Sequence, residues 1–201
     1  VALATRKITE AGSRRIAQAA FEIAMQRPAR KVTAVHKANV MRLSDGLFLE
    51  TVRDVARDFP DVIYEEELVD ATAALLVRDA ARFDVLLTTN MFGDILSDLA
   101  AELAGGLGLA GSLNRGPQAA AAQAQHGSAP AIAGQDVANP TSLILSLAML
   151  LHHLGEVRAA QRITTAIAAC LARPEYRTAD LGGPLGTRAF AAAVVQHMEG
   201  T

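Results

Sequence analysis

The sequence predicts an α/β fold in which parallel strands alternate with helices. Over residues 1–110, short β-branched or apolar runs alternate with segments whose apolar residues recur at helical spacing. Such connections place helices on the faces of a parallel sheet. Hydrophobic residues make up 51% of the chain and aromatic residues only 4%, so the core is expected to consist of alanine, leucine, valine and isoleucine.

The first helix is expected to begin after the capping residue Thr9 and to end at Pro28. Its inward positions are predicted at Ile16, Ala20, Ile23 and Ala24. Three strands and three further helices should follow. The strands are predicted at 31–35, 62–67 and 85–88, and the helices at 45–59, 71–83 and 93–103.

Glycine residues at 105, 106 and 108 interrupt this alternation and predict a domain boundary or hinge near 105–117. Two parts are therefore expected: an α/β part at 1–108 and a mainly helical part at 109–201. The second part should contain helices at 140–154, 157–171 and 187–198. The Ala/Gln patch at 118–125 has poor strand propensity. The apolar run at 143–151 is too short for a membrane span and predicts a core helix.

Charge and cysteine content exclude several classes of partner. The net charge is −2, and no stripe rich in lysine and arginine indicates nucleic acid or an anionic membrane. The single Cys170 lies in an apolar helical pattern and is expected to be a buried thiol. One cysteine allows no internal disulfide, and the beginning of the chain lacks a signal peptide, so a cytoplasmic location is expected.

Two aspartates suggest a metal site. Asp94 and Asp98 are four residues apart and so share one face of their helix. A hard divalent cation such as Mg²⁺ or Mn²⁺ between them would turn their repulsion into attraction. The alternative is a solvated helix face, with Asp94 favoured near the positive end of the helix.

Lys37, Asp70 and Asn90 each follow a predicted strand, and ligands of open α/β sheets bind beyond the carboxyl ends of strands. A partly desolvated Lys37 would suit proton transfer. Alternatively, Lys37 is an exposed lysine at a loop mouth and Asp70 a helix N-cap. The loop from His126 to Pro130 consists of small residues whose N–H groups suit a phosphate or a flat ring, although a lone loop histidine is also a common surface residue.

Together these segments resemble the carboxyl-terminal half of the metal-dependent β-decarboxylating dehydrogenases, which act on isocitrate, homoisocitrate and isopropylmalate. The resemblance covers nearly the whole chain. It rests on His36-Lys37-Ala38-Asn39-Val40-Met41, Leu43-Ser44-Asp45-Gly46-Leu47-Phe48, Asn90-Met91-Phe92-Gly93-Asp94-Ile95-Leu96-Ser97-Asp98, the segment from His126 to Pro130, Ala133-Gly134, Ala138-Asn139-Pro140 and Asp180-Leu181-Gly182-Gly183.

The resemblance implies a truncated isocitrate/isopropylmalate dehydrogenase-like fold, with a parallel or mixed sheet flanked by helices. It implies oxidation and decarboxylation of a small 2-hydroxy acid with Mg²⁺ or Mn²⁺ and NAD or NADP. Lys37 then assists proton transfer, Asn39 lies near substrate and nicotinamide, and Lys37 and Asp70 reach the active site of a neighbouring subunit in a homodimer. The metal ligands implied are Asp70, Asp94 and Asp98, and the cofactor-binding residues are Asn90, His126, Gly127, Ser128, Ala129, Ile132 and Asn139.

Three departures from the family keep other functions open. Ala131 stands where NAD-using members carry an acidic residue, Gln123 replaces a customary glutamate, and the family's first hundred-odd residues are absent. A separate chain is one possible source of the missing half. One alternative is a repurposed decarboxylase, lyase or cyclase that uses the retained lysine and aspartates without hydride transfer. The other is a non-catalytic subunit.

Overall fold

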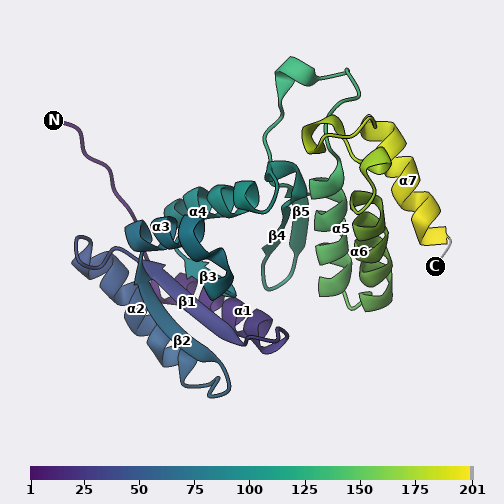
Figure 1. Ribbon diagram of the computed structural model, residues 1–201. Coiled ribbons are helices and arrows are strands. Elements are labelled where there is room, and N and C mark those ends of the chain that lie inside the picture. Colours follow the sequence, from purple (N-terminus) through teal and green to yellow (C-terminus); the bar gives the residue numbers. More distant parts are fainter. Residues whose placement is uncertain (200–201) are drawn as a thin grey trace. The chain divides into compact units, whose positions relative to one another are not determined.

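The computed structural model describes residues 1–199 and confirms the α/β class (Figure 1). The chain divides into two compact units, Val1–Ala100 and a second that begins at Ala101. The division predicted after residue 108 from the glycine-rich segment stays a prediction, since compactness alone does not assign a role to either part.

The first unit is a three-stranded parallel sheet with helices. Its elements, in chain order, are α1 (Glu10–Met25), β1 (Lys31–His36), α2 (Arg42–Ala56), β2 (Ile63–Leu68), α3 (Val69–Asp79), the 3₁₀ turn Ala80–Arg82, β3 (Val85–Thr88) and α4 (Asn90–Leu103). The strand order is β2-β1-β3, and both neighbours run parallel to β1. His36 is opposite Leu68, and Val35 is opposite Thr88. The residues that follow the three strands therefore emerge at one edge of the sheet.

The amino-terminal helix shows where hydrophobic spacing misleads. Thr9 caps α1 as predicted, because its hydroxyl accepts a hydrogen bond from the backbone N–H of Gly12 at 3.2 Å. The predicted inward positions Ile16 and Ile23 are about half exposed, whereas Phe21 is fully buried. Ala20 and Ala24 are buried as predicted, and the rest of the buried face is formed by Ser13, Ala17 and Phe21. Small side chains let the helix approach the sheet closely, and Phe21 stacks on Phe59 with 5.3 Å between ring centroids.

The second unit contains an antiparallel hairpin and three helices. Its elements are the 3₁₀ turn Leu107–Leu109, β4 (Gly111–Arg115), β5 (Ala120–Ala124), the turn Pro130–Ile132, α5 (Thr141–His153), α6 (Val157–Leu171), the turns Pro174–Tyr176 and Ala179–Leu181, and α7 (Thr187–Glu199). Cys170 is a fully buried thiol, as predicted, and burial raises its pKa.

The Ala/Gln patch is a strand, contrary to the expectation from propensity. β5 pairs with β4 from Gly111 opposite Ala124 to Arg115 opposite Ala120. Serine hydroxyls of α5 bind its backbone: Ser146 Oγ donates to the carbonyl of Gln123 at 2.7 Å, and Ser142 Oγ accepts from the N–H of Gln125 at 3.0 Å. Tertiary hydrogen bonds thus outweigh a weak local preference.

The apolar run of α5 contributes to the core, as predicted, but only along one side: Ala148 is buried, and Ile144, Leu145 and Leu151 pack against the same cluster. The buried residues of α5 are Thr141, Ser142, Ser146 and Ala148, because α5 packs both against the hairpin and against α6. Leu143 and Leu147 are about half exposed. No helix among residues 1–199 has the length and apolar character needed to cross a bilayer.

One edge of the first sheet is protected by charge, which makes a pH dependence expected. On β2, the Glu66 carboxylate accepts hydrogen bonds from Arg53 at 2.6 and 2.7 Å and from the Tyr64 hydroxyl at 2.8 Å. Above all the Arg53 hydrogen bonds lower the pKa of Glu66 below its ordinary 4.5.

Because the pKa of Glu66 is lower in the folded state, its contribution to stability is present above pH 4.5 and is lost as pH falls through the folded pKa. Glu66→Gln should therefore flatten the decline of the melting temperature in acid relative to the unmodified protein. Thermal unfolding followed by circular dichroism from neutral pH to below pH 4.5 measures this. A decline of equal steepness in the variant would show that Glu66 contributes nothing to acid sensitivity.

Candidate active site

The turn after β1 carries Lys37 and is fixed by its backbone. The Lys37 carbonyl accepts hydrogen bonds from the N–H groups of Val40 at 2.9 Å and Met41 at 2.8 Å, while His36 Nδ1 accepts one from the N–H of Ala38 at 3.1 Å. This turn therefore leads directly into α2, and it leaves Asn39 exposed.

Lys37 and Asp70 lie together, although they are 33 residues apart in the chain. Lys37 Nζ is 2.5 Å from Asp70 Oδ1, and the Lys37 side chain is 25% exposed against 65% for Asp70. Chiefly this hydrogen bond lowers the pKa of the Asp70 carboxyl, which favours its ionised form. The parallel register explains the meeting, because β1 and β2 end side by side.

These positions bear on the structural alternatives for the two residues, while their catalytic and metal-binding roles stay predictions. Asp70 is not an N-cap: Leu68 holds that position, and Asp70 lies in the first turn of α3, where the helix dipole favours a carboxylate. Lys37 is partly buried and paired, which differs from a solvated lysine at a loop mouth.

Asp94 and Asp98 lie on α4, both exposed, with the carboxylates four residues apart. Asn90 begins this helix, and its amide nitrogen is 3.5 Å from Asp94 Oδ1. α4 starts immediately after β3 because Gly93 permits it: a Cβ there would lie 2.9 Å from Thr88 Oγ1. The exposed oxygen donors suit a hard divalent ion such as Mg²⁺.

Within residues 1–199 no three His, Cys, Asp or Glu side chains form a group able to hold a metal ion. The structure thus brings Lys37 to Asp70 and places Asp94 and Asp98 on one helix, but it does not bring Asp70 to the α4 pair. The predicted three-aspartate set is therefore not assembled within one copy of the described chain, and its assembly across subunits stays a prediction.

The predicted dinucleotide loop lies in the second unit. Gly127, Ser128 and Ala129 are exposed, and Ala129 adopts a left-handed conformation with φ of 42°. His126 is half-buried, and its Nδ1 is 2.9 Å from the carbonyl of Gly127. A Cβ at Gly127 would meet no atom within 4 Å, so a flat ring has room to approach there. Ile132 is 37% exposed nearby in sequence.

Asn139 differs from these loop residues because it is buried and its side chain is engaged at both ends. Its Oδ1 accepts the N–H of Thr141 at 3.0 Å, and its amide nitrogen donates to Asp180 Oδ2 at 3.0 Å. Asn139 thereby caps the start of α5 and ties it to the turn at Ala179–Leu181. The sequence Asn139-Pro140-Thr141 is typical of a helix start, and the structure confirms that role for Asn139, whereas the cofactor role implied by the family resemblance stays a prediction.

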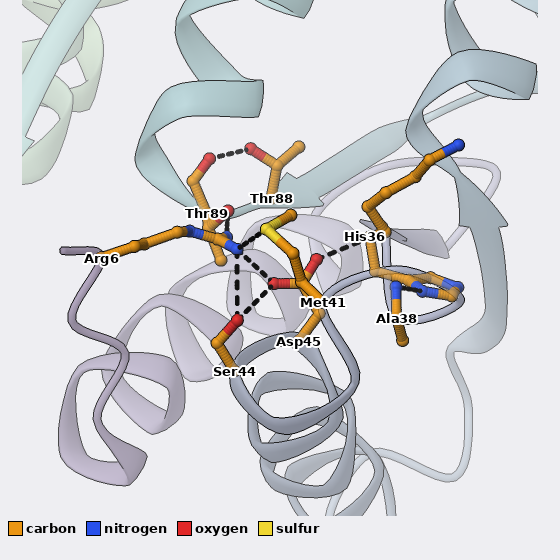
Figure 2. Close-up of polar contacts among 9 residues, drawn as sticks. Arg6, His36, Ala38, Met41, Ser44, Asp45, Thr88 and Thr89 are labelled. Carbon is orange, nitrogen blue, oxygen red and sulfur yellow. Dashed lines mark hydrogen bonds and ion pairs between the residues drawn. The ribbon is translucent and has the colours of Figure 1, made fainter. Parts of the chain in front are cut away.

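Sequence reasoning missed a buried ion pair beside Lys37. Asp45, in the first turn of α2, has no exposed side-chain surface, and its carboxylate contacts Arg6 and the backbone of Lys37 (Figure 2). The only available signal was an aspartate at a position that helical spacing places among apolar residues.

Comparisons with known proteins give a consistent result. Residues 1–195 match the family described as isocitrate/isopropylmalate dehydrogenase. The chain is similar to isocitrate/homoisocitrate dehydrogenase of Thermus thermophilus, with 51% identity over 199 residues, covering 99% of this chain and 59% of that protein. It is 47% identical over 196 residues to 3-isopropylmalate dehydrogenase of Archaeoglobus fulgidus, covering 98% and 60%.

Among solved structures, isocitrate dehydrogenase from Methylococcus capsulatus superimposes with a TM-score of 0.92 at 46% identity, over 96% of this chain and 58% of that one. The chain thus spans about three-fifths of the length of the relatives it matches.

Proposed function

Since the chain belongs to the isocitrate/isopropylmalate dehydrogenase family, we propose that it carries out Mg²⁺- or Mn²⁺-dependent, NAD(P)-linked oxidative decarboxylation of a small 2-hydroxy acid. The observation that carries this proposal is the Lys37–Asp70 contact at the carboxyl ends of two neighbouring parallel strands. Relatives named for isocitrate, homoisocitrate and isopropylmalate match the chain at 46% to 51% identity.

The proposed reaction couples two steps. The C2–H bond breaks and its hydride passes to the nicotinamide, while the hydroxyl proton leaves to a base. The bond between C3 and the departing carboxylate then breaks, CO₂ is released, and a proton is returned to C3. A bound divalent cation would polarise the C2 oxygen and stabilise negative charge there.

This chain's residues have distinct parts in the proposal. Lys37 Nζ exchanges the proton at the substrate hydroxyl, and Asp70 keeps that amine placed through their 2.5 Å contact. Asp94 and Asp98 would supply carboxylate oxygens to the cation, and Lys37 and Asp70 would arrive together from the neighbouring subunit of a homodimer. Asn39 lies near the substrate and nicotinamide, and Asn90 takes part in cofactor binding.

The segment from His126 to Ile132, together with Asn139, would hold the adenosine end of the cofactor. Ala131 offers neither a carboxylate for ribose hydroxyls nor a positive charge for a 2′-phosphate. We therefore propose weak discrimination between NAD and NADP. The exposed small residues Gly127, Ser128 and Ala129 of this loop are compatible with either cofactor.

Removing the metal from the complete protein should abolish activity. Isocitrate, homoisocitrate and 3-isopropylmalate are each assayed with NAD⁺ or NADP⁺, with Mg²⁺ and with excess EDTA, while reduced nicotinamide and CO₂ are both measured. We expect equimolar products with one substrate, loss of both in EDTA and recovery with Mn²⁺.

The same assay separates the alternatives. Release of CO₂ without reduced nicotinamide would replace the proposal with a non-redox decarboxylase. A folded complete protein that turns over none of the three substrates would contradict it.

A further inference from the structure

A buried carboxylate holds the main chain at Lys37. Asp45 is completely buried at the start of α2. Its Oδ2 accepts the backbone N–H of Lys37 at 2.7 Å, and its Oδ1 is 2.5 Å from Arg6 Nη1. An isolated carboxylate in such surroundings is strongly unfavourable, so Arg6 is needed to compensate its charge.

Arg6 reaches this carboxylate from the segment that precedes α1 (Figure 2). The same guanidinium donates through Nη2 to Thr89 Oγ1 at 2.6 Å, and it lies 5.3 Å from the ring centroid of Phe92. Arg6 Nη1 also approaches Ser44 Oγ at 3.5 Å and Met41 Sδ at 3.1 Å. The guanidinium group of Arg6 therefore links the β1–α2 turn to the junction between β3 and α4.

The two segments joined in this way are those that carry the candidate chemistry. The β1–α2 turn presents Lys37, and Thr89 immediately precedes α4, which presents Asp94 and Asp98. We propose that Arg6 and Asp45 form a positioning pair that sets the placement of Lys37 and of the first turn of α4. Neither residue touches the reacting atoms, and the inference rests on the proposed function for its catalytic readout.

A second ion pair that also involves α2, between Arg14 and Asp54, serves as an example of a pair with a structural role only. Arg14 and Asp54 join α1 to α2 at 2.7 Å, but their side chains are 37% and 49% exposed, and they lie on the outside of the two helices. The Arg14–Asp54 pair thus supplies a matched control for the buried pair.

The test uses the complete protein and compares Asp45→Asn with Asp54→Asn. Asparagine keeps the shape and one acceptor at position 45 but removes the charge that holds Arg6. We expect Asp45→Asn to lower kcat by about 10- to 100-fold, with KM changed little, since a misplacement of about 1 Å costs roughly 10²-fold. Asp54→Asn should leave kcat within about twofold, as expected for exposed pairs.

Hydrogen–deuterium exchange supplies a readout besides activity. In Asp45→Asn, peptides covering 31–41 should exchange faster, while peptides covering β2 at 63–68 should keep their rate. If Asp45→Asn does not fold, Arg6→Lys takes its place. Its ammonium still compensates Asp45 but cannot also bind Thr89, and a smaller loss of kcat with the same pattern of exchange is expected.

The outcomes are distinguishable. An active unmodified protein whose kcat and exchange at 31–41 are unchanged by Asp45→Asn or Arg6→Lys would overturn the positioning role. Loss of melting temperature with unchanged kcat would also overturn it, because the pair would then be structural only. An inactive unmodified protein defeats the proposed function instead, and exchange at 31–41 then decides the placement of Lys37 by itself.

Discussion

Replacing Lys37 with methionine is expected to lower kcat by about 10²- to 10⁴-fold, the usual contribution of a positioned proton-transfer group. Methionine keeps an unbranched stem in the partly buried position and removes only the amine that contacts Asp70. Steady-state assays of the complete protein measure kcat and KM, and circular dichroism verifies the fold.

Lys31 offers a control at the opposite end of the same strand. Its Nζ is 2.8 Å from Glu65 Oε2, and its side chain is 17% exposed, so it resembles Lys37 in burial and pairing. Lys31→Met should leave kcat within about twofold, because Lys31 begins β1 and Lys37 follows the other end of that strand. If both variants lose kcat equally, or if Lys37→Met retains it, Lys37 has no part in the proton transfer.

The second large effect is expected on stability. Phe21→Ala should lower the free energy of unfolding by about 3–5 kcal/mol, because it removes a fully buried ring and leaves a cavity. Phe21 also stacks on Phe59 and lies 6.1 Å from the Tyr64 ring, so the loss extends to aromatic contacts. Urea denaturation at constant pH provides the measurement.

Ile16→Ala on the same helix is the matched comparison. Ile16 is 48% exposed, so its truncation should cost about 1 kcal/mol or less. Equal costs for the two substitutions would mean that hydrophobic spacing, which assigned Ile16 to the core, describes α1 better than the structure does.

The contrast between Ile16 and Phe21 shows how far the sequence specifies this fold. Alternation of strands and helices predicted β1, β2 and β3 to within a residue at each end, because β-branched runs bounded by polar residues leave few options. Which face of a helix turns inward depends on the shape of the surface it meets. On α1 and α5, small residues are buried, and several branched residues remain outside.

Of the candidate site, only the part formed within one copy of the chain could be compared with the prediction from sequence. The sequence placed Lys37 and Asp70 after two predicted strands, and the pairing of these strands in the structure brings the two side chains together. It did not reveal the Arg6–Asp45 pair, because 39 residues separate the partners and no local pattern links them. Likewise, β5 escaped prediction because its hydrogen bonds to Ser142 and Ser146 are tertiary.

The buried contact between Arg6 and Asp45 constrains how this sequence can diverge. Loss of either charge alone leaves the other desolvated and is strongly destabilising, whereas exchange of both for apolar residues is often tolerated. The residues at positions 6 and 45 should therefore covary among related sequences. Related sequences that lack an arginine at position 6 should also lack a carboxylate at position 45.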